Sequence, residues 1–209
     1  MQTSSELETA ITSRNLPGIQ EKLKNGRVAI AGLGGLGSNI AVMLARIGIG
    51  KLLLVDFDKV EPSNLNRQYY DLSHIGMKKT EALKSQIDKI NPFVEIETCN
   101  EKVEEDNVPD IFFDYPIVCE AFDLPQYKAV LVNTLLEKGG IKVVAASGMA
   151  GINSANHIKT RHIFKNLYVC GDSQASLQEG IGFMAPRVAI CAGHQAAMAV
   201  RLLLNIEEE

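Results

Sequence analysis

A glycine-rich turn is the first feature of this chain that could do chemistry. Residues 32–37 read Gly-Leu-Gly-Gly-Leu-Gly; they follow the apolar segment 28–31 and precede an apolar stretch that opens at Ser38. Glycines let a backbone approach a phosphate closely, and the amides at the start of a helix bind anions. Asp56 comes 19 residues after the last of these glycines, at the end of the apolar segment 51–55. A carboxylate placed there can bind ribose hydroxyls, so the pattern predicts a ligand that contains adenosine.

Basic residues beyond Asp56 indicate which adenosine ligand fits. Residues 63–68 read Ser-Asn-Leu-Asn-Arg-Gln and include Arg67, and two lysines follow at Lys78 and Lys79. A nicotinamide or flavin oxidoreductase, the usual class of protein with such a turn, has no use for these cations. A nucleoside triphosphate does, because arginine and lysine can neutralise its β and γ phosphates. The sequence therefore favours a triphosphate over a dinucleotide.

Together these motifs resemble one family. The turn at 32–37, Asp-Phe-Asp at 56–58, the run at 63–68 and Met-Ala-Pro at 184–186 are similar to the ThiF, MoeB and HesA proteins of the ubiquitin-activating-enzyme-like superfamily. The resemblance extends over nearly the whole chain. It implies an adenylyltransferase that uses ATP and magnesium to activate the C-terminal glycine of a small ubiquitin-fold sulfur carrier ending in Gly-Gly. Short ThiF-type enzymes of thiamine biosynthesis are the most similar members.

The resemblance also implies roles for individual residues. Those expected at the nucleotide are Gly34, Gly35 and Gly37 near the α-phosphate, Asp56 at the ribose, and Asn64, Arg67, Gln68 and Lys79 along the triphosphate. Lys78 is adjacent to Lys79 and is an alternative match for the same role. Asp123 matches the acid that binds magnesium. The resemblance thus predicts a catalytic set of Arg14, Arg67, Lys79 and Asp123.

Arg14 carries a prediction about assembly. It lies 18 residues before Gly32, in a lead-in segment with no place in the predicted sheet. Family members are commonly homodimers in which an arginine near the N-terminus reaches the triphosphate of the partner chain. An arginine delivered in trans is a planar donor that is always charged. We therefore expect a symmetric dimer in which Arg14 approaches the partner's active site near its Arg67.

Each charged residue in this set also has a simpler interpretation. Arg67, Lys79 and Arg14 can be solvated surface charges. Asp123 stands two residues before Pro125, where it can cap the following helix.

The cysteines argue against a zinc site. Cys99, Cys119, Cys170 and Cys191 contain no Cys-x-x-Cys pair, so the sequence predicts no structural zinc. Longer relatives begin a zinc site where this chain has Cys170 followed by Gly-Asp, and this difference favours the short ThiF type. Residues 175–182, shortly before Met-Ala-Pro, contain no cysteine for a covalent step with the carrier. We interpret Cys170 as structural rather than catalytic.

Composition excludes several other classes of protein. The 209 residues are 46% hydrophobic and 22% charged, with a formal net charge of −4. Such a chain buries a sizeable core, which excludes a disordered tail or a disulfide-stapled miniprotein. The acidic balance indicates no nucleic-acid partner. The polar first 18 residues and the lack of a long apolar stretch indicate no signal peptide and no membrane span, so we expect a cytoplasmic protein.

The elements that must position these residues alternate along the chain. Apolar strand patterns at 28–31, 51–55, 94–99, 117–121 and 141–146 are separated by helical patterns at 38–47, 78–90 and 125–138. This order predicts an α/β, Rossmann-like, mostly parallel doubly wound sheet. Two short antiparallel strands at 162–164 and 168–170, a Gly-, Ser- and Gln-rich loop at 171–182 and a helix at 185–204 follow. We expect residues 1–25 to form a helical lead-in and 26–209 a single ATP-binding adenylyltransferase domain.

Three alternative functions stay open. One is a nicotinamide-dependent oxidoreductase on the same fold. Another is a scaffold that binds the carrier without activating it. The third is a relative that activates a molybdopterin-type carrier or a small carboxylate linked to tRNA.

Overall fold

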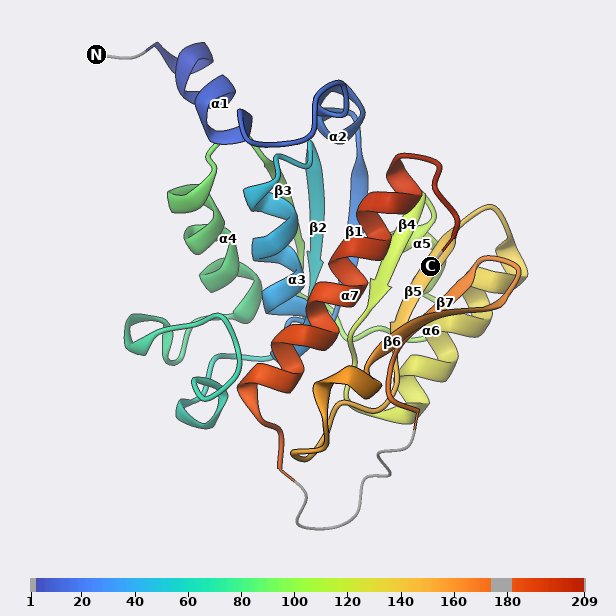
Figure 1. Ribbon diagram of the computed structural model, residues 1–209. Coiled ribbons are helices and arrows are strands. Elements are labelled where there is room, and N and C mark those ends of the chain that lie inside the picture. The colour runs from blue at the N-terminus through green and yellow to red at the C-terminus, as the bar shows by residue number, and fades with distance from the viewer. Residues whose placement is uncertain (1–2, 174–181, 209) are drawn as a thin grey trace.

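One seven-stranded sheet runs through the part of the chain that the structure describes, which is residues 3–173 and 182–208 of a computed structural model (Figure 1). Its strand order is β3-β2-β1-β4-β5-β7-β6. The strands are β1 (Arg27–Ala31), β2 (Lys51–Val55), β3 (Glu95–Cys99), β4 (Ile117–Glu120), β5 (Lys142–Ala146), β6 (Lys159–Phe164) and β7 (Leu167–Gly171). Neighbouring strands are parallel except β6 and β7, which are antiparallel. The predicted Rossmann-like class is confirmed.

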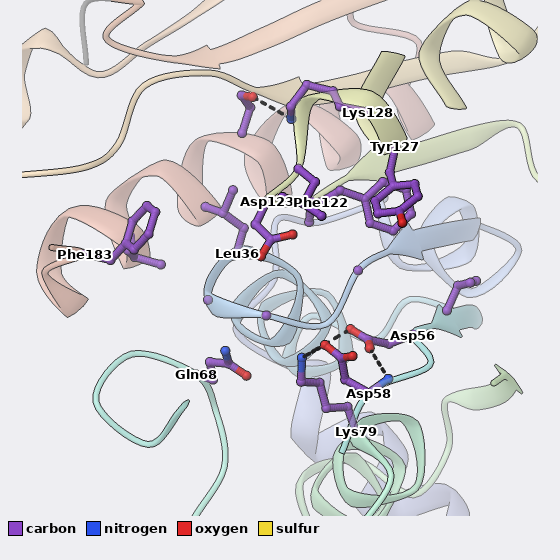
Figure 2. Close-up of a pocket in the computed structure, with 18 of the residues that line it drawn as sticks. Leu36, Asp56, Asp58, Gln68, Lys79, Phe122, Asp123, Tyr127, Lys128 and Phe183 are labelled. Carbon is purple, nitrogen blue, oxygen red and sulfur yellow. Dashed lines mark hydrogen bonds and ion pairs between the residues drawn. The ribbon is translucent and has the colours of Figure 1, made fainter. Parts of the chain in front are cut away.

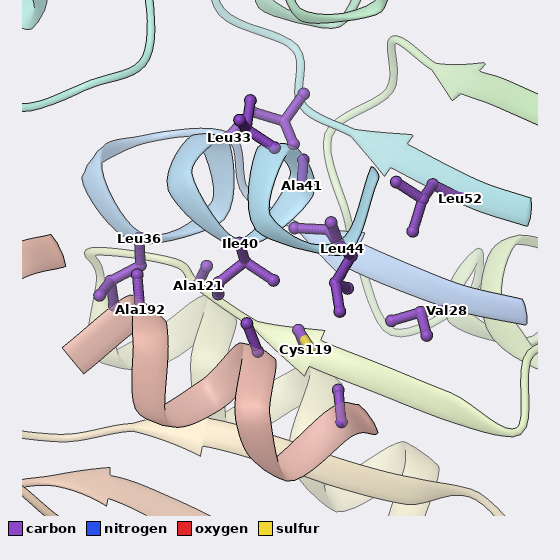
Figure 3. Packing of buried hydrophobic residues seen from close by; sticks show 14 of the residues in the cluster. Val28, Leu33, Leu36, Ile40, Ala41, Leu44, Leu52, Cys119, Ala121 and Ala192 are labelled. Carbon is purple, nitrogen blue, oxygen red and sulfur yellow. The ribbon is translucent and has the colours of Figure 1, made fainter. Parts of the chain in front are cut away.

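Helices cover both faces of this sheet because its strands are apolar on both sides. In β1, Val28 and Ile30 belong to one buried cluster, whereas Ala29 and Ala31 belong to the other. The first face carries α3 (Gly35–Arg46), α4 (Lys79–Ile90) and α7 (Ala185–Leu203), and the second carries α5 (Val108–Phe112) and α6 (Pro125–Lys138). Leu36 of α3 lies beside Ala192 of α7 (Figure 3).

The lead-in lies at the amino ends of the strands (Figure 1). It consists of α1 (Ser4–Thr12) and α2 (Gln20–Lys24). Between them, the Asn15 side chain donates to the Ile47 carbonyl oxygen at 2.8 Å, which ties the lead-in to the C-terminal end of α3. The division into a lead-in at 1–25 and a domain at 26–209 stays a prediction.

Local structure differs from the sequence expectation in three places. Helix α3 begins at Gly35 rather than at Ser38, because the Ser38 amide already donates the first backbone bond of the helix to the Gly34 carbonyl at 3.1 Å. Helix α5 was not expected, since five residues are too few to display a helical period. Strand β7 pairs in parallel with β5 while β6 pairs with β7, so the C-terminal strands extend the main sheet. Most of the loop predicted at 171–182 lies outside the described residues.

The strand order reverses direction between β1 and β4. Loops leave the carboxyl ends of these two strands toward opposite sides, and ligands of such sheets bind in the crevice that this leaves. The turn after β1 and the segment after β4 therefore define where to look for a site. Among the described helices, none is both long enough and apolar enough to cross a membrane.

Candidate functional site

A cavity of about 550 Å³ opens at the carboxyl ends of the strands, at this reversal point (Figure 2). Its walls come from the turn after β1, the ends of β2, β4 and β5, and the start of α7. Seven residues that the sequence singled out line it: Gly34, Gly35, Asp56, Arg67, Gln68, Lys79 and Asp123. The fold thus gathers residues from five separate segments around one hollow.

The three glycines of the turn have different surroundings. At Gly34, an added Cβ would meet only the Gln68 amide, at 3.8 Å, so the backbone is open to the cavity. Gly35 is the first residue of α3 and also lines the cavity. Gly37 does not line it, because its Cβ would lie 1.8 Å from the Gly32 carbonyl oxygen. The lack of a side chain at Gly37 lets α3 pack closely on the turn, and the expected place of Gly37 near the α-phosphate stays a prediction.

Asp56 holds the turn from the end of β2. One of its carboxylate oxygens accepts the Leu33 amide at 2.7 Å, and the other accepts the Asp58 amide at 2.8 Å. Burial raises the pKa of Asp56, and the Lys79 ammonium opposes that rise. The carboxylate lines the cavity at the place where a ribose acid is expected.

Lys79, and not Lys78, is the lysine of this cavity. Its side chain is 8% exposed, and its ammonium lies 2.7 Å from Asp58 and 3.8 Å from Asp56 (Figure 2). The side chain of Lys78 is 49% exposed and pairs at 3.9 Å with Glu81 on the surface. Lys79 is therefore held by two carboxylates and is not the solvated surface charge that the simpler interpretation required.

The segment after β2 contributes Arg67 and Gln68. The Arg67 guanidinium lies 5.4 Å from the centre of the Phe183 ring and donates to Asn66 at 2.8 Å, so it has a fixed place in the cavity wall. The amide oxygen of Gln68 is buried and has no hydrogen-bond partner within the described residues. A polar ligand in the cavity would supply one.

Asn64 does not belong to the cavity wall. Its side-chain oxygen accepts the Glu61 amide at 3.0 Å and so caps a short 3₁₀ turn, Pro62–Asn64. The cavity lining does not include it. Asn64 therefore has a local structural task, and its expected contact with the triphosphate stays a prediction.

Asp123 follows β4 and its exposed side chain points into the cavity (Figure 2). The capping position of α6 is occupied by Leu124, and no side chain caps that helix end. The cap interpretation of Asp123 is therefore wrong. Its carboxylate is therefore available to a ligand in the cavity.

Two charged residues of this site were missed by sequence reasoning. Glu120, the last residue of β4, is fully buried, and Lys128 of α6 donates to it and lines the cavity. Burial raises the pKa of Glu120, and the Lys128 ammonium opposes that rise. A signal existed, since an acid directly after three apolar strand residues needs a buried partner, but no spacing rule identifies Lys128 as that partner.

Arg14 is exposed and lies far from its own chain's cavity. It is next to Asn15, which bonds to the C-terminal end of α3, whereas the cavity lies at the N-terminal end of that helix. A 12-residue helix is about 18 Å long, so a contact within one chain is excluded. The action of Arg14 in trans stays a prediction.

Three of the described cysteines lie in the protein interior and not in a reactive environment. Cys119, Cys170 and Cys191 are buried, and burial raises the pKa of the Cys170 thiol to about 11. A thiol with such a pKa is protonated at neutral pH and is a poor nucleophile.

Comparison with known proteins decides the family. The ThiF family model matches residues 7–209. The chain belongs to the ThiF family. It is 33% identical over 198 residues to the adenylyltransferase and sulfurtransferase UBA4 of Saccharomyces cerevisiae (strain YJM789), a match that covers 90% of this chain and 44% of that protein. It is 32% identical over 194 residues to the molybdopterin-synthase adenylyltransferase of Haemophilus influenzae, with 90% and 78% covered.

Solved structures agree with the fold. The E. coli tRNA N6-threonylcarbamoyladenosine dehydratase TcdA in complex with ATP superposes with a TM-score of 0.86 at 21% identity, over 98% of this chain and 97% of that one. The chain spans less than half the length of its yeast relatives. The family resemblance seen in the motifs is confirmed, and the carrier and the pathway stay predictions.

Proposed function

We propose that the protein uses ATP to adenylate the C-terminal glycine carboxylate of a small ubiquitin-fold sulfur carrier, releasing pyrophosphate, in the cytoplasmic synthesis of the thiamine thiazole. The observation that carries the proposal is the convergence of Asp56, Lys79 and Asp123 on one glycine turn. A ribose acid, a phosphate cation and an oxygen ligand for a metal are what ATP requires. Membership of a family whose named relatives are adenylyltransferases supports the same reaction.

The reaction asks little covalent chemistry of the protein. A carboxylate oxygen of the carrier attacks the α-phosphorus, the new O–P bond forms, and the bond to the β-phosphate oxygen breaks with its electron pair going to pyrophosphate. The attacking carboxylate is already ionised at pH 7, so no general base is needed. The rate enhancement comes mainly from positioning the two reacting groups and from neutralising the phosphate charge. Lys79 and Arg67 would supply that charge, and the open backbone at Gly34 would admit the α-phosphate.

Asp123 fits the magnesium that the family implies. Its carboxylate lines the cavity and caps no helix. Magnesium commonly takes one or two protein carboxylates and completes its shell with phosphates and water. Asp123 would hold the ion, which would neutralise charge on the triphosphate. Within the described residues, no group of three His, Cys, Asp or Glu side chains gathers into a metal site.

ATP–pyrophosphate exchange tests the proposal. Purified protein is assayed with ThiS-like and molybdopterin-type carriers, with a tRNA that bears a small carboxylate, and with no acceptor. We expect exchange with the ThiS-like carrier and none with the same carrier lacking its final glycine. Exchange with the molybdopterin-type carrier alone or with the tRNA alone would reassign the acceptor. Exchange without any acceptor, or hydride transfer from NADH, would reject the proposal.

A further inference from the structure

The buried carboxylate of Glu120 has an unusual position for a charge. It is fully buried at the end of β4, one residue before Ala121 of the cavity wall. One of its oxygens accepts the Phe122 amide at 2.7 Å, and the other accepts the Lys128 ammonium. A buried carboxylate without a cation would be strongly destabilising, so Lys128 has at least the task of neutralising it.

Lys128 is more exposed than a lysine that only neutralises a buried carboxylate needs to be. Its side chain is 28% exposed and lines the cavity. The ammonium donates to Glu120 and, at 2.9 Å, to the Ala146 carbonyl at the end of β5. An ammonium has three N–H donors, and these two bonds are the ones that Lys128 makes to the described part of the chain, so one donor is left for a ligand.

The position of Lys128 separates it from the nucleotide cations. In Figure 2, Lys128 and Asp123 lie on one side of the glycine turn, and Asp56 and Lys79 lie on the other. If the ribose is bound at Asp56 and magnesium is held by Asp123, the nucleotide extends from the Lys79 side to the turn, where its phosphates would lie. The space that is left for an attacking group then lies beyond the turn, toward Lys128.

The wall on this side suits a thin, extended tail. It is formed after Ala146 by Ser147 and Gly148, which carry little or no side chain. Gly148 has a φ of +81°, and a Cβ there would lie 2.3 Å from the Asp172 carboxylate, so this position keeps the glycine. Magnesium held by Asp123 would offset the negative charge of that carboxylate. Lys128 adds a fixed cation on the same side, which attracts an incoming carboxylate.

We propose that Lys128 is a catalytic residue that binds the carboxylate of the acceptor and aims it at the α-phosphorus. This inference rests on the proposed function. The third N–H of Lys128 donates to one carboxylate oxygen while the other oxygen attacks, and no proton is transferred. Glu120 is a positioning residue that holds the ammonium from behind.

A charge-balanced pair of substitutions separates this role from simple neutralisation. Lys128→Met alone leaves Glu120 buried without a cation, so this variant is expected to fold poorly. Glu120→Gln together with Lys128→Met removes both charges, and the glutamine keeps an acceptor for the Phe122 amide. Lys138→Met, at the exposed end of the same helix, is the matched control.

The readouts are the melting temperature, the dissociation constant for ATP, and kcat/KM for the carrier in the exchange assay. For the double variant we expect a melting temperature near that of the wild type, ATP affinity within about twofold, and kcat/KM for the carrier lower by about 10²-fold. The Lys138 control should match the wild type in all three.

A binding measurement tests the same idea without turnover. Carriers ending in a carboxylate or in a carboxamide are titrated into protein that holds a non-hydrolysable ATP analogue. The wild type should prefer the carboxylate by about tenfold, the size of one charge-assisted hydrogen bond, and the double variant should lose this preference.

Three results would overturn the inference. Full recovery of kcat/KM in the double variant would reduce Lys128 to neutralising Glu120. A loss confined to ATP affinity would place Lys128 at the phosphates. An unchanged preference for the carboxylate would give the acceptor another partner. In all three cases the wild type still catalyses exchange and the proposed function stands, whereas absence of exchange with every acceptor rejects both.

Discussion

The two sides of the cavity are built in different ways. The nucleotide side takes its residues from one stretch of chain, between the glycine turn at 32–37 and Lys79. The acceptor side takes Asp123, Lys128 and Gly148 from the segments after β4 and β5. The nucleotide side can be recognised in the sequence as a motif, because its residues stand close together along the chain. The acceptor side exists only once β4 and β5 lie side by side, so the grouping of its residues is recognised from the fold, although Asp123 itself was expected from the family resemblance.

The largest effect expected on the nucleotide side is that of Lys79→Ala. This substitution removes a cation that two carboxylates hold toward the cavity, and loss of such a transition-state donor costs about 10²–10³ in rate. The check is the rate of carrier-dependent ATP–pyrophosphate exchange. Lys78→Ala, one residue away but on the surface, should retain the wild-type rate. Equal exchange rates for the two variants would show that Lys79 does not act in the reaction.

Substitution of the glycines sharpens the same comparison. Gly37→Ala forces a methyl group against the Gly32 carbonyl and should destabilise the fold by about 1–3 kcal/mol, as overpacking typically does. Gly34→Ala meets only the Gln68 amide at 3.8 Å, so the fold should keep its stability while ATP binding weakens. Urea unfolding and ATP titration of both variants distinguish the two. A stable Gly37→Ala variant would contradict the packing role.

These contrasts show how much of the fold and of the site could be predicted from the sequence. The mostly parallel sheet and the position of Asp56 follow from local periodicity and motif spacing, whereas Lys79 and Asp123 were assigned through the family resemblance. Asn64 and Gly37 stand inside the motifs, and the structure shows that they also cap a turn and permit close packing, which motif spacing alone does not reveal. Glu120 and Lys128 could not be paired in advance, because their contact depends on how α6 packs against β4.

Substitution of Arg14 tests whether the N-terminal lead-in of one chain completes the active site of its partner. Arg14→Ala and Lys79→Ala chains are each expected to be inactive alone. A symmetric dimer that places Arg14 in the partner's site would regain one intact site in each mixed dimer, so an equal mixture should recover about a quarter of the wild-type exchange rate. The mixture is refolded together before assay. Activity that stays at the level of the single variants would exclude action in trans.

The smallest stability effect should be that of Asp123→Ala. Lys79 is held in ion pairs, but Asp123 is exposed and caps no helix, so its loss should change the free energy of unfolding by less than about 0.5 kcal/mol. Its effect should appear in the metal dependence, with exchange requiring a higher magnesium concentration because one oxygen ligand is gone. Urea unfolding without nucleotide and a magnesium titration of the exchange rate measure the two effects separately. A clear loss of stability with unchanged magnesium dependence would mean that Asp123 supports the fold rather than the metal.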